Sequence, residues 1–435
     1  ISHTCKKTEV TSMTEHIHKK FTDEQVKDLM QRYLNGEIKR KHVQAILRIG
    51  KSRFFDLLAD YRENPQSFSI AYERTHSTRT IDPEIETNIL KELKTTKNFI
   101  DNKNMPIWSY NYSFIKNDLE TRCQQKVSLP TIIDRAKEHG FYIDRSKKTK
   151  AHDREVITNQ VGELLQHDSS LHLWSPYSQD KWWLITSLDD FSRRILYAML
   201  VPRDLAWPHI VAIESVFLEF GLPLSMYVDS DSIFRFVRGR DELHYKHHQL
   251  TDESIPQWKQ VVHDCQVKVI HALSPQAKGK IERPYGWLQD HIVRICARDN
   301  ISTIAKANQV LFREVHEYNY KRVHSTTKEI PHFRYQRALR EKKNVFRKFF
   351  VPPPFKTLKD IFCFRMDRVV DAYRSVSVNN LQIRFNNAPL RERVTLRIHP
   401  DQKSGLSEVR FWFKDQLLDV QFIKTHLLGL STFKV

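Results

Sequence analysis

The spacing of hydrophobic residues divides the chain into three regions. Between residues 21 and 143, apolar residues recur with a helical period, which predicts amphipathic helices. From Val161 onward, short alternating or fully apolar segments predict strands mixed with helices, and beyond residue 370 mainly short strands are predicted. The sequence therefore predicts a multidomain protein with an all-α N-terminal part, a central α/β core and a small C-terminal β domain.

The N-terminal region contains a helix-turn-helix pattern. Residues 1–20 are polar and unpatterned, and we expect them to form a mobile arm. Within 21–71, Thr22 is the expected cap of a first helix. Further on, a short glycine-containing turn leads into a helix that begins with Lys51 and Arg53. A helix with a basic start after a short turn is typical of DNA-binding helix-turn-helix domains, so Lys51 and Arg53 are candidate DNA contacts. A plain three-helix bundle is the alternative interpretation.

The helical pattern repeats over residues 81–143. Helices are predicted at 81–93, 109–123 and 131–139. Thr131 and Arg135 are expected to be exposed on the last of these, which makes them candidate DNA contacts of a second helix-turn-helix domain. Polar, basic segments at 72–80 and 144–154 flank this region and are interpreted as linkers.

The central region, residues 155–335, follows the order of an RNase H-like fold. Strands are predicted at 163–168, 181–188 and 195–201, and turns join them into a meander. The predicted elements that follow are a helix at 207–220, a strand at 224–228, a helix at 255–265, a strand at 267–272 and a helix that carries Glu282. This order predicts an RNase H-like α/β core.

Three carboxylates occupy the positions where such a fold would bring them together. Asp168 lies on the first strand, Asp229 ends the fourth strand, and Glu282 lies on the helix after the fifth. Three oxygen ligands on rigid elements suit Mg²⁺ (or Mn²⁺), and two such ions can hold both oxygens of an in-line phosphoryl transfer. Taken singly, each residue has a structural alternative, namely a strand-end cap, a turn residue and a charged first helical turn.

Composition narrows the class of partner. The formal net charge of +18 and a pI near 9.5 favour a polyanionic partner such as nucleic acid. No apolar run approaches the length of a membrane span, so no membrane partner is expected. The five cysteines are scattered, which favours a reducing, cytoplasmic compartment and argues against a structural zinc site.

The C-terminal quarter is predicted to be a small β domain. A basic helix is expected at 339–350, and a proline run follows it. Short strands are predicted at 374–378, 381–385, 394–398, 409–412 and 417–420. Several short strands at close spacing predict a small β-barrel over residues 355–435.

Four stretches of the sequence carry a resemblance to a known family. They are GELLQHDSS, WLITSLDDFSRRI, SPQAKGKIER and the segment YNYKRVH at 318–324. The chain resembles DDE transposases of the retroviral-integrase-like superfamily, as found in prokaryotic insertion sequences, and among the subgroups the resemblance favours the ISNCY-type elements. The resemblance covers residues 160–335 best.

The resemblance implies a function and a set of residues. It implies a transposase that binds the terminal inverted repeats of a mobile element in double-stranded DNA, cleaves the ends and joins them to target DNA. It implies that Asp168, Asp229 and Glu282 form the catalytic, metal-binding triad. It also implies that Lys278, Lys280 and Arg283 contact the DNA end. A homo-oligomer on DNA is expected, acting at the nucleoid of a prokaryotic cell.

Two departures from the family pattern leave alternatives open. Asp231 follows Asp229 closely and could assist or replace it as a ligand. A charged insertion at 232–253 lengthens the spacing to Glu282. The alternative functions are a transposase-derived DNA-binding protein that no longer catalyses, and a nuclease acting on RNA–DNA hybrids.

Overall fold

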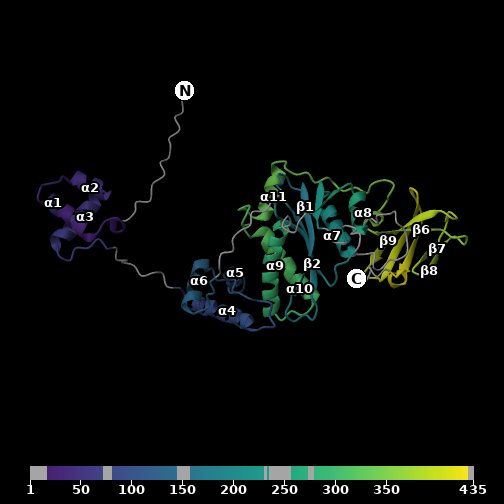
Figure 1. The fold of residues 1–435 in the computed structure, drawn as a ribbon, viewed down its shortest axis with the longest axis horizontal. Coiled ribbons are helices and arrows are strands. Elements are labelled where there is room, and N and C mark those ends of the chain that lie inside the picture. The colour runs from purple at the N-terminus through teal and green to yellow at the C-terminus, as the bar shows by residue number, and fades with distance from the viewer. Residues whose placement is uncertain are drawn as a thin grey trace, which may run out of the picture. The chain divides into compact units, whose positions relative to one another are not determined.

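The structure is a computed structural model that describes residues 17–71, 81–144, 157–229, 233–234, 256–272 and 279–429; for 279–283 it describes the helix but not the side chains. Nearly all of the predicted arm, linkers and charged insertion lie outside these residues, as do Asp231 and Lys278. The chain divides into two units, Ile1–Glu86 and Thr87–Val435 (Figure 1). Across the described ranges, no helix is long and apolar enough to cross a membrane.

The first unit is built around three helices. These are α1 (Asp23–Leu34), α2 (Arg40–Leu47) and α3 (Lys51–Glu63), preceded by a 3-10 turn, η1 (Ile17–Lys19). Thr22 caps α1 as the sequence predicts, in a capping box with Gln25. Apolar side chains of all three helices, among them Met30, Leu47 and Phe54, form the buried core of the unit. Its helices therefore pack through the faces that the periodicity predicts.

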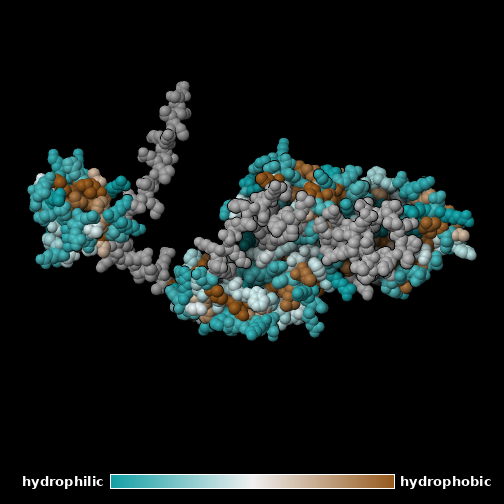
Figure 2. Space-filling view, in the orientation of Figure 1, coloured by the Kyte–Doolittle hydropathy of each residue, from teal (hydrophilic) through white to brown (hydrophobic). Residues whose placement is uncertain are grey.

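The surface of the first unit combines basic and apolar residues. Lys51 and Arg53 are exposed in the first turn of α3. Among the described residues of this unit, the exposed large hydrophobic ones are Leu34, Ile46 and Phe55, and Figure 2 shows a hydrophobic patch on the unit.

Three further helices pack against the core of the second unit. They are α4 (Pro83–Asp101), α5 (Tyr112–Arg122) and α6 (Leu129–Glu138). They contact α9 (Gly279–Arg298), the helix that carries Glu282. Arg298 on α9 pairs with Glu92 at 2.6 Å and with Asp118, while Arg122 pairs with Asp299 at 2.7 Å. The prediction that 81–143 is a DNA-binding domain stays a prediction, but the structure packs these helices against α9 of the second unit.

A five-stranded sheet forms the centre of the second unit. Its strands are β1 (Leu164–His172), β2 (Trp182–Asp189), β3 (Ile195–Val201), β4 (Ser225–Val228) and β5 (Lys268–His271). Their order is β3-β2-β1-β4-β5, with an antiparallel meander of β1 to β3 and parallel pairing of β4 with both β1 and β5. This topology is that of the RNase H-like core predicted from the order of elements.

Helices cover both faces of this sheet (Figure 1). The helices of the second half are α7 (Ala206–Glu219), α8 (Gln257–Asp264), α9, α10 (Ile304–Tyr320), α11 (Pro331–Arg340) and α12 (Leu358–Ile361). Leu165 of β1 packs with α7 and α8 in one hydrophobic cluster. Leu184 and Leu188 of β2 pack with α9 and α10 in another. Because neighbouring residues of a strand point to opposite faces, these clusters identify which side chains face which helices.

Two asparagines of α10 form hydrogen bonds with backbone groups of the edge strand β3. Asn319 of α10 accepts a hydrogen bond from the backbone N–H of Ile195 (3.0 Å) and donates one to its carbonyl (2.8 Å). Asn308 does the same for Leu200, at 2.8 and 3.0 Å. The edge strand β3 thus bonds to α10 at two points, which protects it from pairing with another chain.

The C-terminal strands form open sheets, so the predicted barrel is not confirmed. They are β6 (Phe364–Val369), β7 (Ser375–Val378), β8 (Leu381–Arg384), β9 (Arg393–Asp401), β10 (Leu406–Phe413) and β11 (Gln416–Lys424), followed by η3 (Thr425–Leu428). Four pair in the order β11-β10-β9-β6, and β7 pairs with β8 separately. The four-stranded sheet buries its apolar face partly against the core, where Trp207 of α7 contacts Phe364 and His399.

The predicted helix at 339–350 is wrong beyond its first residues. Helix α11 ends at Arg340, and the following segment pairs with the start of the sheet through bridges of Asn344 to Val161 and Arg347 to Leu222. The basic, aromatic sequence has an adequate helical period, but tertiary hydrogen bonds prevail over it. Gly162 makes this close approach possible, because its φ is +79° and an added Cβ would lie 2.7 Å from the ring of Phe346.

Gly162→Ala should therefore destabilise the chain more than Gly140→Ala. Gly140 also has a positive φ, of +73°, but an added Cβ there would meet nothing within 4 Å. We expect a loss of about 1 kcal/mol for Gly140→Ala from backbone strain and of about 2–4 kcal/mol for Gly162→Ala from strain plus overpacking. Urea unfolding of both variants measures the difference, and equal losses would contradict the packing against Phe346.

Candidate active site

Parallel pairing of β1 with β4 places two of the predicted carboxylates at the same level. The last paired residues are Gln166 and Tyr227. Asp168 lies two residues beyond Gln166, and Asp229 lies two residues beyond Tyr227. In a parallel pair, residues at the same level share a face of the sheet, so Asp168 and Asp229 lie side by side on adjacent strands.

The face that Asp168 shares is the one covered by α9 and α10. Asp168 is 8% exposed and lies directly opposite Thr186 of β2. The hydroxyl of Thr186 donates to the hydroxyl oxygen of Tyr285 on α9, with the oxygens 2.7 Å apart. Gln289, one turn further along α9, donates to Ser170 of β1 at 3.2 Å. Helix α9 is thus hydrogen-bonded both to β1, which carries Asp168, and to the adjacent strand β2.

The pKa of the Tyr285 hydroxyl reflects both its burial and the charge of aspartates. Burial raises the pKa of the Tyr285 hydroxyl well above its ordinary value. The charges of Asp168, Asp204 and Asp229 raise its pKa further.

Glu282 lies on α9 one turn before Tyr285. That spacing puts both residues on the same side of the helix, and Tyr285 is the one that contacts the sheet beside Asp168. The side chains of Glu282, Lys280 and Arg283 lie outside the described residues, and Lys278 lies outside them altogether. Among the side chains that are described, no group of three or more His, Cys, Asp or Glu residues could hold a metal ion. The triad as a whole therefore remains a prediction.

Thr186 and Tyr285 were not among the residues predicted from sequence. Tyr285 could have been found by its spacing, because it lies three positions after Glu282 on a predicted helix. Thr186 offers no such signal, since its place opposite Asp168 depends on the register of two strands.

Two other aspartates, Asp189 and Asp190 at the end of β2, have structural partners. Asp190 pairs with Arg193 at 3.0 Å and accepts a hydrogen bond from Gln166 at 2.6 Å. Asp189 accepts hydrogen bonds from the N–H and hydroxyl of Ser192, and burial raises the pKa of Asp189 to about 6. Both residues therefore build the turn after β2.

The predicted DNA-contacting residues of the N-terminal helices lie on α6 and on α3. Thr131 lies in the first turn of α6, where its hydroxyl is 2.7 Å from that of Ser128, the helix cap. Arg135 pairs with Glu138 at 2.8 Å on the same helix. Lys51 and Arg53 belong to the first unit.

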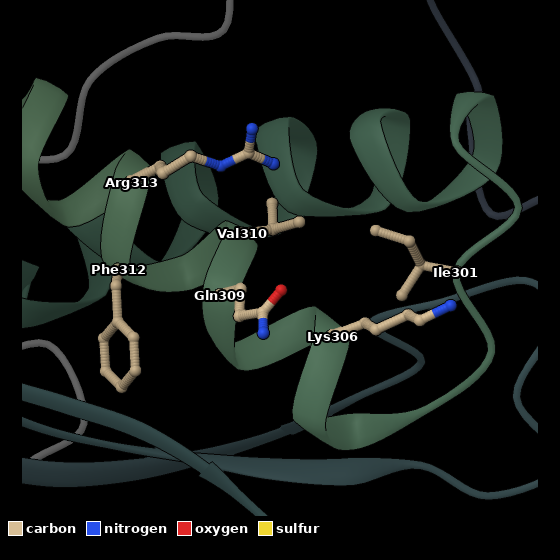
Figure 3. A pocket seen from close by; sticks show the side chains of 6 residues that line it. All are labelled: Ile301, Lys306, Gln309, Val310, Phe312 and Arg313. Atoms are coloured by element: carbon tan, nitrogen blue, oxygen red, sulfur yellow. The ribbon is translucent and has the colours of Figure 1, made fainter.

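A surface hollow on α10 is not the active site. It measures about 510 Å³ and is lined by Ile301, Lys306, Gln309, Val310, Phe312 and Arg313. Lys306 extends toward Ile301, whereas Phe312 points away from the others (Figure 3). The hollow contains no carboxylate and lies at the edge of the cluster behind β2 and β3, so it offers no ligand for a cation.

The strand order and the paired aspartates place the central region in the RNase H-like class. Two curated proteins match the chain in sequence. A putative transposase, y4bF, of Sinorhizobium fredii is 25% identical over 193 residues, which is 44% of this chain and 40% of that protein. The transposase for insertion sequence IS1202 of Streptococcus pneumoniae is 26% identical over 170 residues, 39% of this chain and 35% of that protein. No family model matches the chain.

These relatives confirm the predicted resemblance: the chain is similar to insertion-sequence transposases. It spans about two fifths of the length of the curated relatives it matches.

Two solved structures of viral integration proteins are similar as well. The simian T-cell lymphotropic virus intasome in complex with PP2A regulatory subunit B56 gamma matches 68% of this chain and 89% of its own, at 12% identity and a TM-score of 0.34. The HTLV-2 integrase catalytic core domain in complex with magnesium (dimeric form) matches 40% and 98%, at 16% identity and a TM-score of 0.28. These superpositions are too loose to assign the fold, which the strand order defines by itself.

The hydroxyl of Tyr285 should contribute to stability, whereas that of Tyr318 should not. Both tyrosines are buried in the cluster of α9 and α10, but within the described part of the chain the Tyr318 hydroxyl has no hydrogen-bond partner. We expect Tyr285→Phe to cost about 1 kcal/mol and Tyr318→Phe to be neutral or slightly stabilising. Urea unfolding of both variants is the measurement. An equal effect of the two changes would mean that the bond to Thr186 does not anchor α9.

Proposed function

We propose that the chain is a DNA transposase that binds the ends of a mobile element, cleaves them and joins them to target DNA. The observation that carries the proposal is the level placement of Asp168 and Asp229, with α9 bonded to the sheet beside them. The similarity to insertion-sequence transposases supports it. Its setting would be the DNA of a prokaryotic cell.

Asp168, Asp229 and Glu282 are the proposed ligands of Mg²⁺ (or Mn²⁺). Asp168 and Asp229 provide hard oxygen donors at the same level of the sheet, which fits such a cation. Glu282 would complete the set from α9, near the N-terminus of a helix, where a carboxylate is favoured. Two bound ions would polarise the scissile phosphate and lower the pKa of the attacking water or hydroxyl.

The chemistry needs no covalent bond to the protein. In the first step, water attacks a phosphodiester at the end of the element, a new P–O bond forms, and the 3′-oxygen leaves as a hydroxyl. In the second step, that 3′-hydroxyl attacks a phosphodiester of the target, and the target's own 3′-oxygen leaves. Each step exchanges one P–O bond for another, so the protein has only to position the reacting groups and stabilise their charge.

Basic residues would hold the DNA. Lys278, Lys280 and Arg283 lie next to Glu282 in sequence, and we propose that they contact the phosphates of the DNA end. Lys51 and Arg53 are exposed at the start of α3, and Thr131 and Arg135 lie on α6; these four would contact the terminal inverted repeats. Because both ends of an element must be cut together, the working form would be a homo-oligomer on DNA.

Glu282→Gln should abolish joining while sparing DNA binding. The assay combines the full chain, Mg²⁺, a plasmid target and labelled duplexes from the DNA that flanks the coding sequence on either side. We expect joined products from the wild type and a loss of at least about 1,000-fold in Glu282→Gln, because the amide cannot replace an anionic ligand.

Glu314→Gln is the matched control. Glu314 is a carboxylate on α10 that bonds to His291 at 2.9 Å, and the variant should retain joining. Joining by Glu282→Gln at the wild-type rate would refute the proposed site. Specific binding of the flanking DNA without cleavage by the wild type would favour the catalytically inactive DNA-binding protein.

A further inference from the structure

A chain of buried hydrogen bonds runs behind Asp168, on the opposite face of β1. The ring of His167 bonds through Nδ1 to the hydroxyl of Ser187 and through Nε2 to Nδ1 of His209, each at 2.8 Å. Nε2 of His209 lies 2.8 Å from one oxygen of Asp204. The other oxygen of Asp204 accepts a hydrogen bond from Ser169 at 2.9 Å. The chain therefore starts on β2, passes through α7 and returns to β1.

The carboxylate at its end sets the direction of every bond. Asp204 can only accept, so Nε2 of His209 donates to it, and a neutral His209 then accepts at Nδ1. His167 must donate from Nε2 and accept at Nδ1, which makes the hydroxyl of Ser187 the first donor. In this arrangement each of the four bonds has one donor and one acceptor. A chain of aligned bonds in a dry interior is stronger than the same bonds in water.

Aromatic rings enclose the two histidines. Both are fully buried. The ring of His167 stacks on Trp258 of α8, with centroids 5.6 Å apart and an interplanar angle of 10°. The ring of Phe234 packs in T-shaped pairs with His167 and His209, with ring centroids 5.7 and 5.1 Å apart, respectively. Alternative rotamers of either histidine would break both hydrogen bonds and this packing, so the chain has one favourable arrangement.

The two residues of β1 in this chain, His167 and Ser169, are the immediate neighbours of Asp168. Along a strand their side chains point away from the face that Asp168 shares with Thr186. Asp204 and His209 lie at the start of α7, just before and within its first turn. The backbone of Asp168 is thus tied on both sides to α7, while its own carboxylate faces α9.

We propose that Asp204 and His209 are positioning residues that fix the backbone of Asp168, and with it the cation-binding geometry of the site. This inference rests on the proposed function, because it requires that Asp168 is a ligand. A purely structural role for the chain would cost stability without changing the affinity for a cation. The two roles are therefore separable by measurement.

His209→Leu removes both hydrogen bonds of the ring, and His291→Leu is its matched control. His291 is also a buried histidine that contacts an aromatic ring, Phe114, and bonds to one carboxylate, that of Glu314. His209→Gln is the conservative variant, because the oxygen and nitrogen of its amide can accept from His167 and donate to Asp204. Asp204→Ala removes the carboxylate that bonds to His209 and Ser169, at a position just before the helix. It serves as the second variant if His209→Leu does not fold.

The measurement is the affinity of the full chain for Mn²⁺, which is determined from the electron paramagnetic resonance signal of the free ion. Thermal unfolding of each variant is recorded alongside. Asp168→Asn defines the binding that belongs to the site. We expect His209→Leu or Asp204→Ala to weaken that binding about tenfold, as loss of supporting bonds behind a ligand does elsewhere. His209→Gln should recover most of it, and His291→Leu should lose stability only.

Each outcome decides one question. Wild-type Mn²⁺ affinity in both His209→Leu and Asp204→Ala, with binding still lost in Asp168→Asn, would overturn the positioning role and leave the proposed function standing. Unchanged binding in Asp168→Asn would refute the proposed site itself, and the positioning role with it.

Discussion

The structure of the site depends on the parallel pairing of β1 with β4. This pairing joins segments about sixty residues apart and sets Asp168 level with Asp229. A shift of one residue in this register would turn one of the two carboxylates to the opposite face of the sheet. The segment after α11 supports this register, because it pairs with Val161 before β1 and with Leu222 before β4. Gly162 allows the segment to approach closely.

Asp168 is held from both faces of the sheet, by different kinds of contact. On the face of the sheet that Asp168 shares, the hydrogen bond between Thr186 and Tyr285 holds α9, the helix that carries Glu282, against β2. On the opposite face, the buried chain through His209 ties the neighbouring backbone to α7. Carboxylates that lie close together repel one another, which lowers the stability of the folded chain. The contacts on both faces of the sheet would offset this repulsion at the proposed site.

The sequence was sufficient for the order of elements but not for the contacts between them. Asp168 and Asp229 could be predicted because each ends or follows a strand predicted from the sequence, a local signal. The partners of Asp168 could not, because Thr186, His209 and Tyr285 reach it only through strand register and helix packing. Residues 341–350 have a helical period, yet long-range hydrogen bonds prevail over it. The C-terminal strands were predicted, but closure into a barrel depends on edge pairing, which spacing does not encode.

The most direct test of the central claim is to map which backbone segments surround the bound cation. Fe²⁺ placed in the site, with ascorbate and hydrogen peroxide, generates hydroxyl radicals that cut the nearby backbone, and mass spectrometry of the full chain locates the cuts. Convergence of the triad predicts cuts in three segments, next to Asp168, Asp229 and Glu282, which Mg²⁺ suppresses by competition. Cuts confined to other segments, or cuts at Asp168 and Asp229 without any near Glu282, would contradict it.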